Sequence, residues 1–150
     1  MKFRVLLADD HAMFRDALRM VLEMAPEVEI VAEAADGRAV LELFGASRPD
    51  VVCMDVNMPG LNGVDATRQL LALHPEVRII GLSCDADPRM VAEMIGAGAH
   101  GYVVKMNAGR DLLPAIHRVS QNQIYLSPEF ECLDIAGLVP PIGFDAAPCK

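Results

Sequence analysis

Tryptophan is absent from this 150-residue chain, and aromatic residues make up only 5% of it. Because apolar residues still reach 53%, the hydrophobic core must be built almost entirely from aliphatic side chains. Basic residues are also scarce, with 13 against 21 acidic ones, and the formal net charge of −8 repels phosphate backbones. That charge argues against direct nucleic-acid binding by this chain.

Metal-binding cysteine patterns and long apolar runs are missing as well. The N-terminal residues 1–4 lead directly into a short apolar segment followed by acids, so we expect neither a signal peptide nor a membrane span. The cysteines show no Cys-x-x-Cys or other metal spacing, which predicts free thiols in a reducing compartment. They are Cys53, Cys84, Cys132 and Cys149. Together these features predict a soluble, cytoplasmic protein.

Short runs rich in Val, Ile and Leu alternate with amphipathic stretches along the chain. Such runs suit the central strands of a parallel sheet, and the stretches between them repeat apolar residues at helical spacing, as at Phe14, Leu18 and Val21. Five strand–helix units predict an α/β fold, an open, doubly wound, five-stranded parallel sheet with helices on both faces. The expected strands are 3–8, 28–33, 51–54, 78–82 and 101–104.

The C-terminal part of the chain differs in composition from the rest. Residues 127–150 contain four prolines and no sustained apolar period, and a segment of that composition does not form a second domain. We therefore expect one domain at residues 1–126, followed by a tail or truncated linker at 127–150.

Polar side chains stand at the ends of four predicted strands. Asp9 and Asp10 follow the first strand, Asp55 the third, Ser83 the fourth and Lys105 the fifth. The carboxyl ends of parallel strands meet at one edge of the sheet, where doubly wound folds hold their sites. A pair of carboxylates ~4 Å apart costs about 4 kcal/mol at an effective dielectric of ~20, and a divalent cation relieves that cost. Oxygen ligands favour Mg²⁺ (or Mn²⁺) over Zn²⁺.

These side chains are suited to receiving a phosphoryl group. Asp55 is the candidate nucleophile, because a carboxylate can form an acyl phosphate. Lys105 would neutralise the added charge, and the Ser83 hydroxyl would donate a hydrogen bond to a phosphoryl oxygen. His11, next to the acid pair, is interpreted as an exposed residue of the first helical turn.

Four motifs in this order resemble the receiver domains of bacterial two-component response regulators. They are LADDH at 7–11, DVNMPG at 55–60, GLS at 81–83 and GAGAHGYVVK at 96–105, and the resemblance covers residues 3 to 126. It implies a flavodoxin-like fold with strand order 2-1-3-4-5. It also implies metal binding by Asp10, Asp55 and the Asn57 backbone carbonyl, with Asp9 acting through water, and a switch made of Ser83 and Tyr102.

The resemblance also implies a function and partners. A sensor histidine kinase would phosphorylate Asp55 in a Mg²⁺-dependent step, and the altered surface would control dimerisation or a transcriptional output domain. The sequence of these motifs is most similar to the subfamily whose receivers precede a LuxR-type helix-turn-helix output domain. That domain has no counterpart in residues 127–150, so the tail is expected to be a natural truncation, vector-derived or frame-shifted.

Two other functions remain open from the residues alone. One is a constitutive protein-interaction module whose acidic pocket is unused. The other is a phosphatase with an aspartyl nucleophile, but one large family of these enzymes needs Asp-x-Asp, and here Val56 and Asn57 follow Asp55. We therefore expect a phosphoacceptor signalling domain rather than an enzyme.

Overall fold

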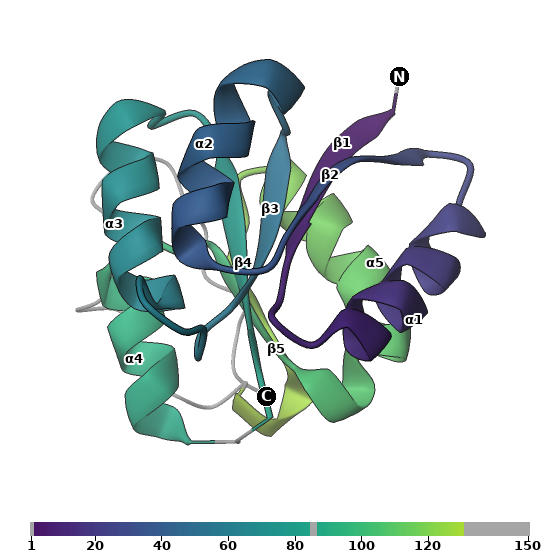
Figure 1. Ribbon diagram of the computed structural model, residues 1–150. Coiled ribbons are helices and arrows are strands. Elements are labelled where there is room, and N and C mark those ends of the chain that lie inside the picture. Colours follow the sequence, from purple (N-terminus) through teal and green to yellow (C-terminus); the bar gives the residue numbers. More distant parts are fainter. Residues whose placement is uncertain (1, 85–86, 131–150) are drawn as a thin grey trace.

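A central parallel sheet with a layer of helices on each face forms the domain (Figure 1). The computed structural model describes residues 2–84 and 87–130. The strand order is β2-β1-β3-β4-β5-β6, and every neighbouring pair is parallel. The predicted order 2-1-3-4-5 is confirmed, and a sixth, two-residue strand is added at the β5 edge. The strands are β1 (Phe3–Ala8), β2 (Val28–Ala34), β3 (Val51–Asp55), β4 (Arg78–Ser83), β5 (Gly101–Val104) and β6 (Tyr125–Leu126).

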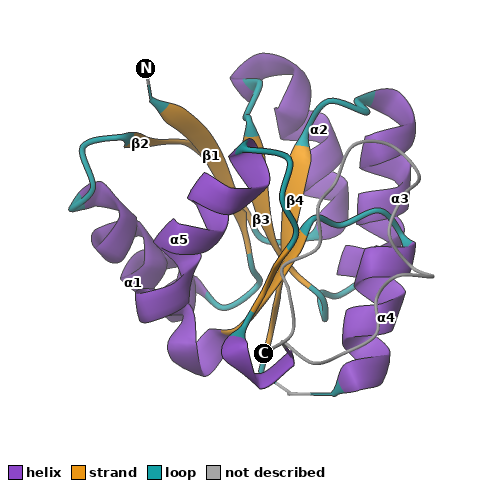
Figure 2. Cartoon of the chain, turned by 180° about the vertical axis from the view of Figure 1, so that it is seen from behind, coloured by secondary structure: helices purple, strands orange, loops and turns teal. Residues whose placement is uncertain are grey.

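The helices divide between the two faces of the sheet. Figure 2 shows α1 and α5 together on one face, and α2, α3 and α4 cover the other. Two short 3₁₀ helices, η1 (Lys105–Asn107) and η2 (Pro128–Phe130), follow β5 and β6. In the described part of the chain, none of the helices combines the length and apolarity needed to cross a membrane. The α-helices are α1 (Ala12–Glu23), α2 (Gly37–Ser47), α3 (Gly63–Leu73), α4 (Pro88–Gly96) and α5 (Ala108–Ser120).

Alternation along the strands sends neighbouring side chains into two separate cores. In β1, Val5 and Leu7 pack in the core under α1 and α5, whereas Leu6 and Ala8 pack in the core under the other three helices. All four are at most 1% exposed. Burial on both faces explains why this part of β1 is a continuous apolar run, and burying each Val or Leu side chain contributes roughly 1.5–3 kcal/mol.

The end of the described chain packs onto β5. Ser127 is fully buried, and its Oγ accepts a hydrogen bond of 3.0 Å from the Val104 amide. Phe130 is 3% exposed and meets the Tyr102 ring edge to face, with 5.6 Å between ring centroids. Both residues lie in the segment expected to be a tail, so the packed structure continues to Phe130. Residues 131–150 lie outside the described part of the chain.

His100 is a buried titratable residue at the amino end of β5, remote from the acidic edge. Its Nδ1 accepts a hydrogen bond of 3.0 Å from the Ile79 amide, and its own amide donates to the Ile79 carbonyl at 2.8 Å. Burial, assisted by the positive charge of Arg78, lowers the pKa of His100 to about 3. The neutral ring is therefore part of the folded structure.

The buried neutral state of His100 predicts acid sensitivity of the fold. The unfolded ring binds a proton near pH 6.5 and the folded ring does not, so stability is fully present above pH 6.5 and falls as the pH decreases. At pH 5 the loss should reach about 2 kcal/mol. His100→Asn keeps an acceptor for the Ile79 amide without titrating. Denaturant unfolding of both proteins at pH 7 and pH 5 measures the difference, and equal losses in the two would contradict this role.

Candidate phosphoacceptor site

Strand register brings the acidic residues together. β1 and β3 are neighbours, with Ala8 opposite Met54, so the next residues of the two strands, Asp9 and Asp55, lie side by side at the carboxyl edge. Asp55 is the last residue of β3 and is 2% exposed, and Asp9 is 1% exposed. The predicted convergence of Asp9, Asp10 and Asp55 is therefore present in the structure.

Lys105 bridges the two buried carboxylates. Its Nζ lies 2.6 Å from Asp9 Oδ2 and 3.1 Å from Asp55 Oδ2, and its side chain is 8% exposed. Because β4 separates β3 from β5, the long lysine side chain must reach across roughly two strand spacings, about 10 Å. Burial alone would lower the pKa of Lys105, but hydrogen bonds and charge from Asp9 and Asp55 outweigh it and raise that pKa. The ammonium therefore stays charged at neutral pH.

Burial is the main influence on the Asp55 carboxyl group. It raises the pKa of Asp55, while hydrogen bonds from Lys105 and the Asn57 amide act in the opposite direction and the negative charge of Asp9 adds to the rise. The Asn57 amide donates to Asp55 Oδ1 at 3.1 Å. The Asp55 side chain is thus held by two donors at the start of the β3–α3 loop.

Gly63, the first residue of α3, packs directly against the backbone of Asp55. A Cβ atom at this position would lie 2.2 Å from the Asp55 carbonyl oxygen and 2.8 Å from the Val56 Cα. The Gly63 amide donates to the Val56 carbonyl at 2.9 Å, and the Asn62 side chain caps the helix by accepting from the Asp65 amide. Glycine is therefore required for α3 to close the loop beneath Asp55.

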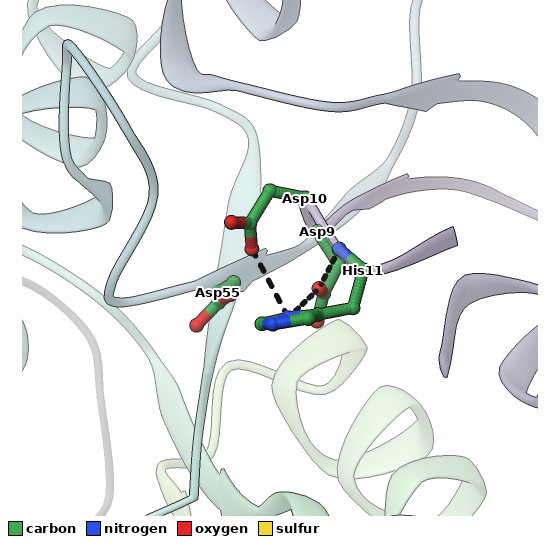
Figure 3. A group of neighbouring side chains, drawn as sticks. All are labelled: Asp9, Asp10, His11 and Asp55. Carbon is green, nitrogen blue, oxygen red and sulfur yellow. Dashed lines mark hydrogen bonds and ion pairs between the residues drawn. The ribbon is translucent and has the colours of Figure 1, made fainter. Parts of the chain in front are cut away.

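Figure 3 shows the Asp9, Asp10 and Asp55 carboxylates and the His11 ring gathered in one cluster. One ligand atom from each of the four residues lies within 4.8 Å of the others. His11 Nδ1 is 3.2 Å from Asp9 Oδ1 and 3.2 Å from Asp10 Oδ1, and the His11 side chain is 67% exposed. This ring is as exposed as predicted, but its contact with both acids was not expected. Oxygen atoms at this spacing are suited to hold a divalent cation.

Ser83 and Tyr102, the predicted switch residues, lie on the two strands beyond β3. Ser83 ends β4, is 1% exposed and pairs with Val104, the residue before Lys105. Tyr102 is fully buried in the core under α4 and lies beside Gly81 rather than at the acidic edge. The structure therefore places Ser83 next to the site and Tyr102 behind it.

Two α1 residues belong to the surroundings of the site and were not predicted from the sequence. The Phe14 ring centroid lies 4.8 Å from Lys105 Nζ, within range of a cation–π contact. Arg15 donates from Nη1 to the Asp9 carbonyl oxygen. Their helical spacing indicates only one half-buried face of α1, and its docking against the strand ends appears only in the three-dimensional structure.

Comparisons with known proteins agree with this arrangement. The family model described as response regulator receiver domain matches residues 5–117. The chain is 38% identical over 128 residues to the transcriptional regulatory protein DegU of Brevibacillus brevis, covering 85% of this chain and 54% of DegU. It is 34% identical over 123 residues to the nitrate/nitrite response regulator NarL of Escherichia coli K12, covering 82% of this chain and 57% of NarL. The chain thus spans little more than half the length of these relatives.

A solved structure shows the same likeness. The LuxR family two-component response regulator from Aurantimonas sp. SI85-9A1 superposes with a TM-score of 0.82 at 32% identity, covering 86% of this chain and 92% of that one. The parallel sheet, its acidic carboxyl edge and these matches together identify a signalling domain. The chain belongs to the family of response regulator receiver domains, which accept a phosphoryl group from a kinase on an aspartate.

The buried Lys105 bridge predicts a large effect of removing its charge. Lys105→Met leaves Asp9 and Asp55 buried without their cation, and breaking a buried ion pair in this way costs about 3 kcal/mol of unfolding free energy at pH 7. The loss should shrink in acid, as the carboxylates become protonated. Denaturant unfolding measures it, with the exposed Lys2→Met as the matched control. An unfolding free energy equal to that of the control would contradict the bridge.

Proposed function

We propose that Asp55 is the phosphoacceptor of this receiver and that a sensor histidine kinase is its phosphoryl donor. The observation that carries the proposal is the buried Asp55 carboxylate, which ends β3 within 3.1 Å of Lys105 Nζ and beside the Asp9 and Asp10 carboxylates. Phosphoryl transfer to a carboxylate needs a nucleophile, which Asp55 supplies, and positive charge beside it, which Lys105 supplies directly and the acid pair supplies by holding a metal ion.

We propose Mg²⁺ (or Mn²⁺) as the cation of this site. Asp10, Asp55 and the Asn57 backbone carbonyl would bind it, and Asp9 would act through a bound water. Three carboxylates against the Lys105 ammonium leave a formal charge of about −2, which a divalent cation balances. The donor set of hard oxygens supports this choice, and the bound cation would neutralise negative charge on the incoming phosphoryl group.

The chain's own residues would act on the phosphoryl group in complementary ways. An Asp55 carboxylate oxygen attacks phosphorus, the new O–P bond forms as the N–P bond of the donor phosphohistidine breaks, and the imidazole leaves with the bonding electrons. Lys105 Nζ, which lies 3.1 Å from the Asp55 carboxylate, would form an ion pair with the phosphoryl oxygens once Asp55 is phosphorylated. The Ser83 hydroxyl, at the end of β4, would donate a hydrogen bond to one of them.

The signal would then leave the site through β4 and β5. Ser83 pairs with Val104, two residues beyond Tyr102 on β5, and Tyr102 packs against Phe130 near the end of the described chain. A shift of Ser83 towards the phosphoryl group would thus alter the packing of Tyr102 and the surface over β5. We propose that this surface controls homodimerisation or, as the name of DegU states for that protein, a transcriptional output.

This function places the chain in the cytoplasm, without contact to a membrane and without direct binding to DNA, because its net charge of −8 repels phosphates. Residues 1–126 would form the receiver and 127–150 a linker or tail, the first residues of which pack onto β5 as far as Phe130. A phosphatase reaction would need a general acid at the second position after Asp55, where Asn57 stands. A constitutive interaction module would keep its acidic edge unphosphorylated, and the experiment below separates that case.

Acetyl phosphate with Mg²⁺ should transfer one phosphoryl group to the wild-type chain. The product should be visible in the intact mass and labile to hydroxylamine, as acyl phosphates are. Asp55→Asn should not be labelled. Asp50→Asn is the matched control, because Asp50 precedes the opposite, amino end of the same strand and should leave labelling unchanged.

Two outcomes would contradict the assignment of Asp55. One is labelling of Asp55→Asn to the wild-type extent, which would place the acceptor elsewhere. The other is the absence of labelling in all three proteins, which would favour the constitutive interaction module.

Mg²⁺ should also stabilise the unphosphorylated chain, because it relieves repulsion among the carboxylates. At ten times its dissociation constant the cation adds about 1.4 kcal/mol, a melting-temperature rise of several degrees. Asp10→Ala should lose most of this rise, and it should melt no lower than wild type without the cation because one repelling charge is gone. Differential scanning calorimetry measures both quantities. The exposed Glu42→Ala is the control, and a full Mg²⁺ response in Asp10→Ala would overturn the metal site.

A further inference from the structure

Arg15, on the first turns of α1, reaches back to the acid pair at the end of β1. Its Nη1 donates a hydrogen bond to the carbonyl oxygen of Asp9, and its side chain is 19% exposed. That carbonyl belongs to the peptide that joins Asp9 to Asp10. The guanidinium therefore touches the backbone between the two acids, on an atom that neither carboxylate uses.

Glu33 of β2 fixes the Arg15 guanidinium from its other side. Arg15 Nε lies 3.3 Å from Glu33 Oε1, and Glu33 Oε2 accepts a hydrogen bond of 2.8 Å from Arg19 Nη1. One carboxylate thus holds two arginines that are one helical turn apart on α1. In Figure 1, α1 lies against the side of the sheet at which β2 is the edge strand.

The orientation of the Asp9–Asp10 peptide determines where the Asp10 carboxylate can point. Asp9 itself is anchored at several atoms, since its amide donates to the Ala34 carbonyl and its carboxylate meets Lys105 and the His11 amide. Asp10 is less constrained, with a side chain that is 31% exposed. A fixed peptide plane limits the directions that the Asp10 Cα–Cβ bond can take.

We propose that Arg15 is a positioning residue that holds the Asp9–Asp10 peptide so that Asp10 faces the cation. This inference rests on the metal site of the proposed function. Groups that orient metal ligands through hydrogen bonds commonly change affinity for the metal 10- to 100-fold when they are replaced. Arg15→Met should therefore weaken Mg²⁺ binding about tenfold.

Arg19 provides a matched control within the same helix. It also pairs with Glu33 and carries the same charge, but its ion pairs are with Asp16, Glu23 and Glu33, and it makes no hydrogen bond or ion pair with Asp9. Arg19→Met therefore breaks the packing of α1 against β2 without touching the acid pair, and it should change Mg²⁺ affinity less than twofold. Arg15→Lys keeps one donor and should restore part of the affinity.

The experiment is a titration of the 150-residue chain and each variant with Mg²⁺ alone, followed by the amide NMR signals of Asp10 and Asn57. The melting temperature without Mg²⁺ shows how much each variant is destabilised. The expected result is about tenfold weaker binding in Arg15→Met, intermediate binding in Arg15→Lys and near wild-type binding in Arg19→Met. Acetyl phosphate labelling of Arg15→Met should reach the wild-type extent when Mg²⁺ is raised about tenfold.

Four results would overturn the proposal. Equal weakening in Arg15→Met and Arg19→Met would show that both arginines act only by fastening α1 to β2. Tighter binding in Arg15→Met would show that the guanidinium acts by repelling the cation through its charge. Absence of Mg²⁺ binding in the wild type would overturn the metal site together with this inference, whereas unchanged binding in Arg15→Met alone would overturn only the role of Arg15.

Discussion

Repulsion among Asp9, Asp10 and Asp55 is the constraint on which the rest of this structure depends. Their ligand atoms lie within 4.8 Å of one another, and like charges at ~4 Å repel by about 4 kcal/mol at an effective dielectric of ~20. Lys105 offsets the repulsion for the two buried carboxylates, and Asp10 is left at the rim. The carboxyl edge of the sheet therefore keeps a net negative charge in the folded protein, and this charge favours binding of a cation. A purely structural cluster would gain nothing from keeping the third carboxylate.

The fold supplies the precision that such a crowded site needs. Parallel pairing of β1 with β3 brings Asp9 beside Asp55, and β5 delivers Lys105 from across β4. Gly63 lets α3 approach the Asp55 backbone closely, while Phe14 and Arg15 of α1 approach from the opposite helical layer. Each contact comes from an element whose burial is determined by aliphatic packing. The chemistry of the edge is therefore a consequence of strand register and helix docking.

Sequence patterns predicted most of this architecture because the inner strands β3, β4 and β5 and the second half of β1 are buried on both faces and are therefore apolar runs, whereas the edge strand β2 keeps charged residues among its apolar ones. Strand β6 has two half-buried residues and no such run, so its existence depends on pairing with β5. The positions of Asp9, Asp55 and Lys105 were predicted together with the strands, because each of these residues stands at the carboxyl end of an apolar run. Arg15 was missed because helix docking brings it to the acids, and helical periodicity contains no information on docking. His11 was interpreted only as an exposed residue, because its contact with both acids depends on how the turn between β1 and α1 orients its ring. Phe130 was assigned to the tail because residues 127–150 contain four prolines and no sustained apolar period, and its burial depends on contact with Tyr102.

Measuring the pKa of the Asp55 side chain, with and without Mg²⁺, tests the proposed site most directly. A pH titration of the Asp55 carboxyl carbon by ¹³C NMR reports the pKa of this side chain alone. We predict a pKa above the ordinary aspartate range without metal, because burial dominates the environment of Asp55, and a downward shift on addition of Mg²⁺, because the cation favours the carboxylate. A pKa in or below the ordinary range that does not respond to Mg²⁺ would contradict both the crowding and the metal site.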